Sequence, residues 1–359
     1  MRRFRLWVVV SALLVAAGVA PVASAQAAAG VVVKVSGNKL VDGLGRPIRL
    51  LGVNRSGSEY ACIQGWGIFD GPSDATSIAA IAAWHTNAVR LPLNEDCWLG
   101  INSTSANQAQ MGAVYRQAIR AYVQRLHAAG LAVILDLHIT APGKEVATGA
   151  TLEPMPDAHS TAFWKSVAKA FKSDPGVLFD LYNEPNNVGW SCWLSGCILN
   201  DALKPGATFR AVGMQALVDA VRSTGAVQPI MAGGLQWSSD LSQWPAGLSD
   251  PAGQLVASVH VYAYSSETQA YWDQTMAPVA AAYPMVTGEL GEFDCAHGFI
   301  DGYMGWADAH GVSYLGWTWD ATAPGGWTCG GGPSLITNYD GTPTGFGVGL
   351  RDHLAATSP

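Results

Sequence analysis

Short apolar runs recur along the chain, and the stretches between them carry apolar residues spaced three and four apart. The short runs are typical of buried parallel strands, and the longer stretches are typical of amphipathic crossover helices. Strands are predicted at residues 49–53, 88–93, 132–137, 177–182, 229–232, 256–261, 284–287 and 313–318. Helices are predicted at residues 75–85, 107–129, 158–172, 209–223, 268–283 and 295–309, and residues 352–356 finish a last one. This alternation predicts an α/β fold, a single (β/α)8 TIM barrel.

Weaker patterns add detail at the edges of this fold. Residues 31–35 and 38–41 alternate around a short turn and predict an N-terminal β-hairpin, which would close the barrel at the amino ends of its strands. Asp74 and Asp157 are expected to cap the helices that follow them. Residues 237–253 contain scattered apolar positions and two prolines, so the helix after the fifth strand is poorly marked.

The first 25 residues have the pattern of a secretory signal peptide. Arg2, Arg3 and Arg5 precede an apolar run, and Ala23-Ser24-Ala25 offers a small-residue cleavage site. An uncleaved membrane anchor is the alternative, but the run is short for a membrane span and Pro21 closes it. We therefore expect residues 1–25 to be removed and residues 26–359 to form one secreted, extracellular domain without a membrane contact.

Charge and composition exclude several classes of partner. The 359 residues are 49% apolar and 13% charged, and without residues 1–25 the chain has 17 basic and 27 acidic residues, a net charge of −10 instead of −7. An acidic surface repels phosphate backbones, so nucleic acid is not expected as a partner. No glycine-rich phosphate loop opens a helix after a predicted strand, and no Cys-x-x-Cys motif is present. We expect a monomer that uses no cofactor and no metal.

Six cysteines in an exported chain favour disulfides. Fifteen pairings of six cysteines are possible. Proximity in the sequence favours Cys192–Cys197, and the neighbouring loops of a barrel favour Cys62–Cys97 and Cys295–Cys329.

Two glutamates follow predicted strands in similar contexts. Asn183-Glu184-Pro185 comes directly after residues 177–182, and Glu289 comes just after residues 284–287. Proline cannot donate to a sheet ladder, so the strand should end there and leave Glu184 at the mouth of the barrel. Two carboxyl groups that face one sugar ring could act as acid and nucleophile.

Other polar and aromatic residues should converge on the same mouth, because the carboxyl ends of all eight strands meet there. Arg90 could keep a nearby glutamate ionised, Tyr262 could donate to the same carboxylate, and Asn183 could bind a sugar 2-hydroxyl. The residues at the strand ends are Asn54, Arg90, His138, Asn183, Glu184, His260, Tyr262, Glu289, Trp317 and Trp319.

These residues carry a resemblance to a known family. The chain resembles glycoside hydrolase family 5, the cellulase-like retaining barrel glycosidases, in six motifs that occur in the expected order: Arg90-Leu91-Pro92, Asp136-Leu137-His138, Asn183-Glu184-Pro185, His260-Val261-Tyr262, Gly288-Glu289-Leu290-Gly291 and Trp317-Thr318-Trp319. The opening Gly43-Leu44-Gly45-Arg46-Pro47 and Leu51-Gly52-Val53-Asn54 resemble the start of secreted bacterial endoglucanases of this family.

The resemblance implies a secreted retaining hydrolase of β-glycosidic bonds in a polysaccharide or oligosaccharide, in first place an endo-β-1,4-glucanase. Glu184 matches the family's acid/base and Glu289 its nucleophile. The implied sugar-binding residues are Arg90, His138, Asn183, His260, Tyr262 and one tryptophan, for which Trp319 is preferred to Trp317 because it lies nearer the mouth. The role of Glu59, in the first loop, is left open.

Several alternatives also stay open. Family 5 includes mannanases, other glucanases and furanosidases, and the loop sequences do not identify the polymer or decide between endo and exo action. A non-catalytic carbohydrate-binding barrel and a metal-dependent hydrolase are rivals from other classes. Some tryptophans in predicted loops should contact sugar and the others should only pack: Trp66, Trp98, Trp190, Trp193, Trp237 and Trp327.

Overall fold

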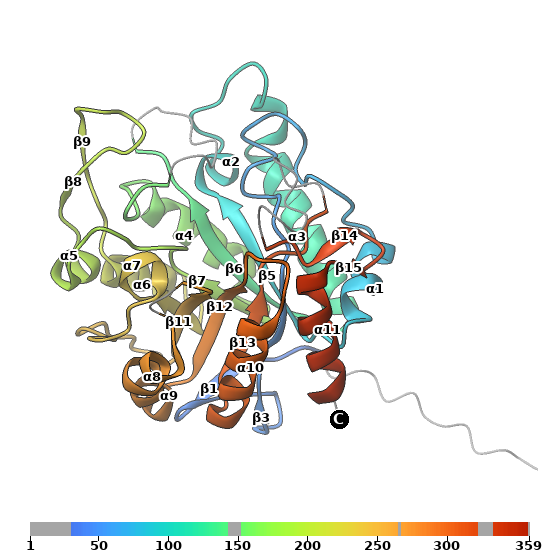
Figure 1. Ribbon diagram of the computed structural model, residues 1–359. Helices are drawn as coiled ribbons and strands as arrows, with labels where there is room; N and C mark the ends of the chain where they lie inside the picture. Colours follow the sequence, from blue (N-terminus) through green and yellow to red (C-terminus); the bar gives the residue numbers. More distant parts are fainter. Residues whose placement is uncertain (1–29, 143–151, 265–266, 322–332, 358–359) are drawn as a thin grey trace, which may run out of the picture.

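A closed barrel of eight parallel strands forms the centre of the molecule (Figure 1). The computed structural model describes residues 30–142, 152–264, 267–321 and 333–357. In order around the barrel the strands are β4 (Leu51–Asn54), β5 (Ala88–Asn94), β6 (Ala132–Ile139), β7 (Val177–Asp180), β10 (Ile230–Gly233), β11 (Leu255–Tyr262), β12 (Met285–Gly291) and β13 (Ser313–Gly316). The predicted (β/α)8 TIM barrel is therefore confirmed.

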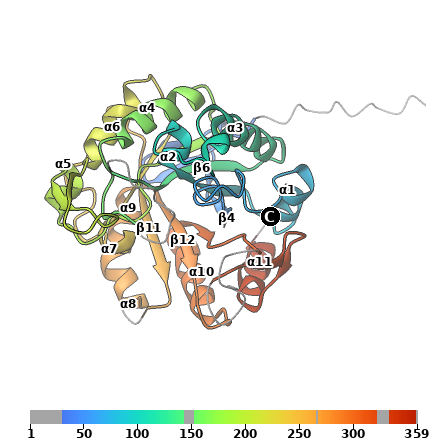
Figure 2. The ribbon, with the colours of Figure 1, turned by 90° about the horizontal axis from the view of Figure 1, so that it is seen from above.

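Helices surround the barrel, as the view along its axis shows (Figure 2). They are α1 (Ala75–Ala82), α2 (Glu95–Leu99), α3 (Ala113–Ala128), α4 (Ser160–Phe171), α5 (Trp190–Ser195), α6 (Met214–Arg222), α7 (Leu235–Ser238), α8 (Gln269–Tyr271), α9 (Ala277–Ala282), α10 (Gly298–His310) and α11 (Gly345–Thr357). A 3₁₀ turn, η1 (Gln108–Gln110), and a π turn, η2 (Trp272–Met276), complete the helical elements of the described chain.

The burial pattern explains why these segments fold as they do. Every residue of β5 and β6 is buried, because one face of each strand packs inside the barrel and the other packs against helices. Helix α3 buries Ile119, Val123 and Leu126, which lie three and four residues apart on one face. Burying one such side chain contributes about 1.5–3 kcal/mol.

The N-terminal hairpin closes the barrel at the end where its strands begin. Strands β1 (Lys34–Ser36), β2 (Lys39–Val41) and β3 (Pro47–Ile48) form a small antiparallel sheet. Val33 and Leu40 pack with a ring of apolar residues from the barrel strands, among them Leu178 and Met231. The predicted plug is confirmed, and it leaves the opposite end of the barrel for the site.

The structure corrects the bounds of several predicted helices. The helix expected at 209–223 begins at Met214, because β8 (Ile198–Asn200) and β9 (Thr208–Arg210) form a hairpin in the preceding loop. The helix expected at 268–283 is divided by the π turn η2. Asp74 caps α1 by accepting from the Ser77 amide at 2.9 Å, but α4 begins after His159, so Asp157 is not its N-cap.

Two of the three expected disulfides are present: Cys62–Cys97 joins the loop after β4 to α2, and Cys192–Cys197 joins α5 to the residue before β8. Disulfides are typical of proteins that fold in an oxidising compartment. Cys329, and with it the expected Cys295–Cys329 pair, lies outside the described residues, as do residues 1–25. No helix in the described part of the chain is long and apolar enough to cross a membrane.

The two disulfides should differ in how much they stabilise the fold. The loop-closure model assigns about 4 kcal/mol to Cys62–Cys97, whose cysteines are 35 residues apart, and about 2 kcal/mol to Cys192–Cys197, which are 5 apart. We expect the double variant Cys62→Ala/Cys97→Ala to lose more unfolding free energy in guanidinium titrations than Cys192→Ala/Cys197→Ala. Equal losses, or the reverse order, would contradict this assignment.

Candidate active site

A cavity of about 670 Å³ opens at the carboxyl ends of the strands. Both predicted glutamates line it, together with residues from the loops after β10, β11 and β12. The lining residues are His138, Asn183, Glu184, Gln236, Trp237, Ser239, His260, Tyr262, Tyr264, Glu267, Glu289, Phe293, Trp317 and Pro333. Residues far apart in the sequence thus meet in one cleft, as the barrel predicted.

Glu184 and Glu289 face each other across this cleft. One carboxylate oxygen of Glu184, one of Glu289 and a ring nitrogen of His260 all lie within 4.8 Å of one another. Glu184 follows β7, whose last residue is Asp180, whereas Glu289 lies inside β12. The pairing of β11 with β12 shifts register between Val259 and His260, so that His260 lies opposite Glu289. Such irregularities re-aim side chains, and this one occurs where the site is built.

Glu289 accepts two strong hydrogen bonds. Arg90 donates from Nη1 to Oε1 at 2.9 Å, and the Tyr262 hydroxyl donates to Oε2 at 2.5 Å. Both oxygens are therefore engaged by donors, which suits a carboxylate rather than a carboxylic acid.

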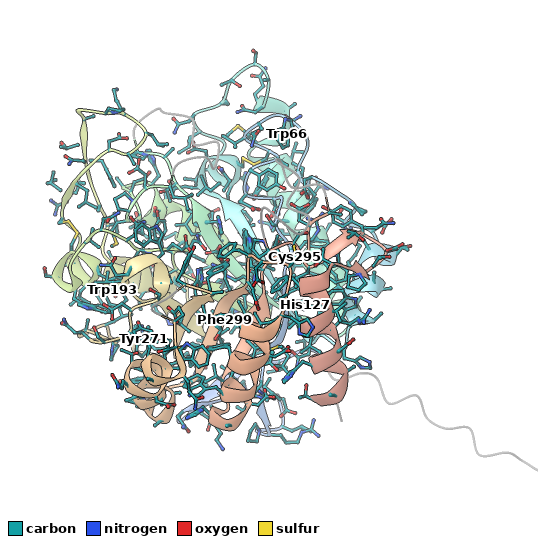
Figure 3. All side chains as sticks on the ribbon, viewed as in Figure 1. Trp66, His127, Trp193, Tyr271, Cys295 and Phe299 are labelled. Atoms are coloured by element: carbon teal, nitrogen blue, oxygen red, sulfur yellow. A yellow bond between two sulfur atoms is a disulfide. The ribbon has the colours of Figure 1, made fainter. Side chains whose placement is uncertain are left out.

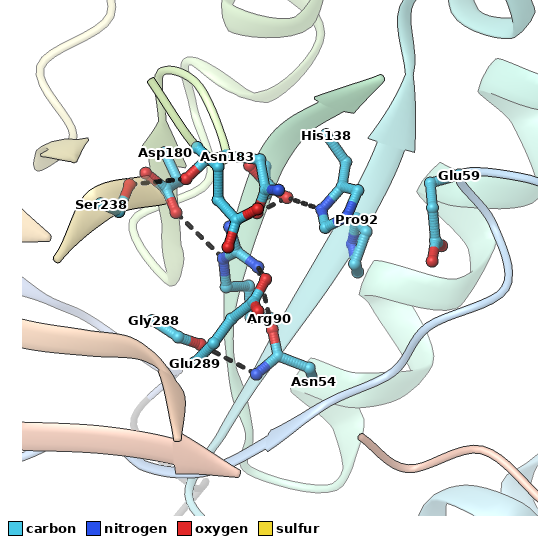
Figure 4. Close-up of polar contacts among 12 residues, drawn as sticks. Asn54, Glu59, Arg90, Pro92, His138, Asp180, Asn183, Ser238, Gly288 and Glu289 are labelled. Carbon is cyan, nitrogen blue, oxygen red and sulfur yellow. Dashed lines mark hydrogen bonds and ion pairs between the residues drawn. The ribbon is translucent and has the colours of Figure 1, made fainter. Parts of the chain in front are cut away.

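Arg90 is fully buried and binds several groups at once (Figure 4). Its Nε donates to Asp180 at 2.9 Å, and its Nη2 lies 3.0 Å from Asp136. Nη2 also donates to the Asn183 side-chain oxygen at 2.9 Å, and Nη1 lies 3.1 Å from that of Asn54. One guanidinium thus orients five side chains from four strands or their ends, as its planar fork allows.

Glu184 has a different environment. Burial raises the pKa of its carboxyl to about 7, although the charges of His138 and Arg90 oppose the shift. Oε1 lies 3.0 Å from Nδ1 of His260. Burial lowers the pKa of His260 to about 4, so this ring is neutral near pH 7. Glu184 can therefore hold a proton at neutral pH beside a neutral imidazole.

His138 forms one wall of the cleft. Its Nδ1 lies 2.7 Å from Asp136, and this hydrogen bond raises the pKa of His138 against the opposing effect of burial. The imidazole stacks on Trp317 with ring centroids 5.4 Å apart and planes 10° apart. Trp317 is thereby fixed as a flat surface at the end of the barrel.

The preference for Trp319 as the sugar-binding tryptophan is wrong. Its side chain is fully buried, and its ring packs edge-on against Trp84 at 4.8 Å. Strand β13 ends at Gly316, so the strand alternation that would place Trp317 and Trp319 on one face does not continue. The Trp319 amide instead donates to the Asn54 carbonyl at 2.8 Å.

The structure also places the residues whose roles were open. Glu59 is buried outside the cleft lining, where it accepts from the Ser56 hydroxyl at 2.5 Å and from the Gly57 amide at 2.7 Å, and so orders the first loop. Trp98 and Trp193 are fully buried and pack inside the protein. Trp66 is 56% exposed, does not line the cleft and packs edge-on against Tyr60 with ring centroids 6.0 Å apart, whereas Trp193 lies in α5 (Figure 3).

Sequence reasoning missed one side of the cleft. Gln236, Ser239, Tyr264, Glu267 and Phe293 line it but were not predicted. Tyr264 and Phe293 lie close to Tyr262 and Glu289 in the sequence, and their aromatic character was the available signal. The others lie in the loops after β10 and β11, which carry no periodic pattern. Trp237 was among the tryptophans considered, and it lines the cleft with 49% of its surface exposed.

Known proteins resemble this chain in sequence and in fold. The mannan endo-1,4-β-mannosidase of Streptomyces lividans is 27% identical over 312 residues, which cover 84% of this chain and 69% of that protein. Endoglucanase E-5 of Thermobifida fusca is 27% identical over 174 residues, which cover 44% of this chain and only 29% of that protein.

Solved structures show the same fold. A β-glucanase from Saccharophagus degradans superposes with a TM-score of 0.69 at 19% identity, covering 91% of this chain and 94% of that one. That β-glucanase has also been solved in complex with cellotetraose. The family model for cellulase, glycosyl hydrolase family 5, matches residues 41–323, a range that contains Arg90, Glu184 and Glu289. This protein therefore belongs to glycoside hydrolase family 5 and is a glycosidase.

Proposed function

We propose that this protein is a secreted retaining endo-β-1,4-glucanase in which Glu184 is the acid/base and Glu289 the nucleophile. The observation that carries the retaining mechanism is the short separation of the two carboxyl groups, because one oxygen of each lies within 4.8 Å of the other. Retaining glycosidases hold the two groups about 5–5.5 Å apart, whereas inverting ones leave about 6.5–9.5 Å for a water molecule. Secretion is proposed from the pattern of residues 1–25 and from the two disulfides.

In the first step Glu184 gives its proton to the glycosidic oxygen while a Glu289 oxygen attacks the anomeric carbon. The bond between that carbon and the leaving oxygen breaks, and a glycosyl ester forms on Glu289. In the second step the Glu184 carboxylate takes a proton from water, and the water oxygen attacks the same carbon. Glu289 then leaves as a carboxylate, to which Arg90 and Tyr262 again donate.

Binding of the sugar falls to residues already held in place. The side-chain oxygen of Asn183 accepts a hydrogen bond from Arg90. The Nδ2 amide of Asn183 is therefore the group available to a sugar 2-hydroxyl. Trp317 offers an apolar surface to the pyranose ring. Beyond the two glutamates the cleft continues along the exposed side chains of Trp237, Tyr264 and Phe293. A row of aromatic residues suits a polymer that extends past the scissile bond.

Cleavage of β-1,4-mannan is the second candidate, because the Streptomyces lividans relative is a mannosidase. The cellotetraose complex of the Saccharophagus degradans β-glucanase supports glucan. Glucose and mannose differ at carbon 2, whose hydroxyl would lie near Asn183 in either case. The rates of cleavage of matched glucan and mannan polymers must therefore decide between the two substrates.

A product assay tests linkage and stereochemistry together. We expect purified enzyme to release soluble oligosaccharides from carboxymethyl cellulose and mixed-linkage glucan faster than from mannan or xylan. Proton NMR during the first minutes should show the β-anomer of the new reducing end, because two displacements restore the configuration. Initial release of the α-anomer would overturn the mechanism, and faster cleavage of mannan would reassign the substrate.

Variants of the two glutamates should separate their roles. We expect Glu184→Gln to lose about 10²–10⁴-fold in kcat on polymer, because a positioned acid contributes that much. Its kcat/KM should fall far less on an aryl glycoside, whose phenolate leaves without a proton, and azide should speed its turnover because azide attacks the intermediate without a base. Glu289→Gln should be inactive on both substrates. Circular dichroism confirms folding, and a Glu184→Gln variant equally impaired on both substrates would contradict the assignment.

The pH profile should reflect the proton on Glu184. Because burial raises the pKa of this carboxyl to about 7, the protonated form predominates below pH 7 and is lost above it. We expect kcat/KM on polymer to fall tenfold per pH unit on the alkaline side of about pH 7. With the aryl glycoside, Glu184→Gln should lack this limb. An identical alkaline limb in the variant would assign it to another group.

A further inference from the structure

A second cluster of titratable side chains lies outside the cleft, between α2 and the segment that leads into α4. Glu95 is the first residue of α2, and Asp157 and His159 precede α4. One carboxylate oxygen or ring nitrogen from each lies within 4.8 Å of the others. Glu95 and Asp157 are 0% and 1% exposed, whereas the His159 side chain is 36% exposed. The cluster is therefore buried on its carboxylate side and reachable from solvent through the histidine.

The polar atoms of this cluster lack ordinary partners. Both oxygens of Glu95, Oδ2 of Asp157 and Nδ1 of His159 are buried and make no hydrogen bond of ordinary length and angle within the part of the chain that the structure describes, although Asp157 and the Ser160 hydroxyl lie close to Glu95. The basic side chain nearest to the carboxylates in the described chain is His159, whose Nδ1 lies 3.9 Å from Glu95 and 3.5 Å from Asp157. Buried carboxylates without partners are strongly unfavourable. A proton or a cation is therefore required to balance the charge of the two carboxylates.

A shared proton is the simplest candidate. Burial and the charge of Asp157 raise the pKa of Glu95 well above its usual range, so the pair can hold a proton at neutral pH. One proton satisfies one oxygen on each side at most. It leaves the second Glu95 oxygen without a partner, whereas a metal ion could contact a ligand atom of all three residues.

We propose that Glu95, Asp157 and His159 bind a divalent cation that ties α2 to the segment before α4. Two carboxylates and one imidazole suit Zn²⁺ or Mn²⁺, whereas Ca²⁺ takes six to eight oxygen ligands. Helices α2 and α4 lie in contact (Figure 2) and follow the adjacent strands β5 and β6. The ion would cross-link two neighbouring strand–helix connections, the second of which begins after Ile139, the residue that follows His138. Its role is structural and independent of the proposed glucan specificity.

Calorimetry and thermal unfolding test the site without relying on activity. The protein is treated with EDTA, dialysed, and titrated with Zn²⁺ and separately with Mn²⁺. We expect one ion per chain from at least one of them. At a hundredfold excess over Kd the Tm should rise by about 3–6 °C. Ca²⁺ at equal concentration should raise the Tm less.

Two variants locate the ion. Glu95→Gln/Asp157→Asn keeps the side-chain volumes and removes the buried charges, so it should be at least as stable as the metal-free protein and should not respond to the metal. Glu184→Gln is the matched control, because Glu184, His260 and Glu289 also approach within 4.8 Å of one another. It should keep the full Tm shift.

Three results would overturn the proposal: no binding of either ion, an unchanged shift in Glu95→Gln/Asp157→Asn, or a shift abolished by Glu184→Gln. The first result would mean that the cluster holds only a proton. If the double variant does not fold, His159→Asn replaces it, because this side chain is partly exposed and should tolerate substitution. It should bind the ion at least tenfold more weakly, and unchanged affinity would reject the site.

Discussion

One buried positive charge organises the barrel mouth. The guanidinium of Arg90 lies 2.9 Å from Asp180, 3.0 Å from Asp136 and 2.9 Å from Glu289, and all four side chains are almost completely buried. Without Arg90 these acids would be uncompensated charges in the barrel interior, a state that disfavours folding by several kcal/mol. Burial raises the pKa of Asp180 to about 7 even with Arg90 beside it. The site therefore depends on the three ion pairs of Arg90, which join β5 to β6, β7 and β12.

This arrangement separates the chemistry of the two glutamates. Glu289 receives a full positive charge and a phenolic hydroxyl, whereas Glu184 receives a neutral imidazole and a low-dielectric environment. In the proposed mechanism these different environments let one carboxyl attack while the other retains its proton, although both belong to the same residue type. Pairs of acids whose environments differ in this way are characteristic of glycosidases.

The sequence alone predicts the parts of the fold and of the site that follow regular patterns. Eight apolar strands could be found because parallel strands are buried on both faces, and the strand ends placed Arg90, Glu184 and Glu289 together.

Trp319 was misplaced because its prediction assumed that the strand pleat continues past Gly316. Gln236 and Glu267 were missed because the loops that carry them have no period. Asp157 was taken for a helix cap, since a sequence does not show that α4 starts later or that Glu95 lies beside it.

The central claim is that Glu184 and Glu289 act on one glycosidic bond and that Glu289 becomes covalently attached to the sugar. A 2-deoxy-2-fluoro cellobioside with a good leaving group slows the second step and allows the intermediate to accumulate. Mass spectrometry of the digested protein should then find one added glycosyl unit, on the peptide that contains Glu289. A label on another residue, or steady turnover without any label, would contradict the account.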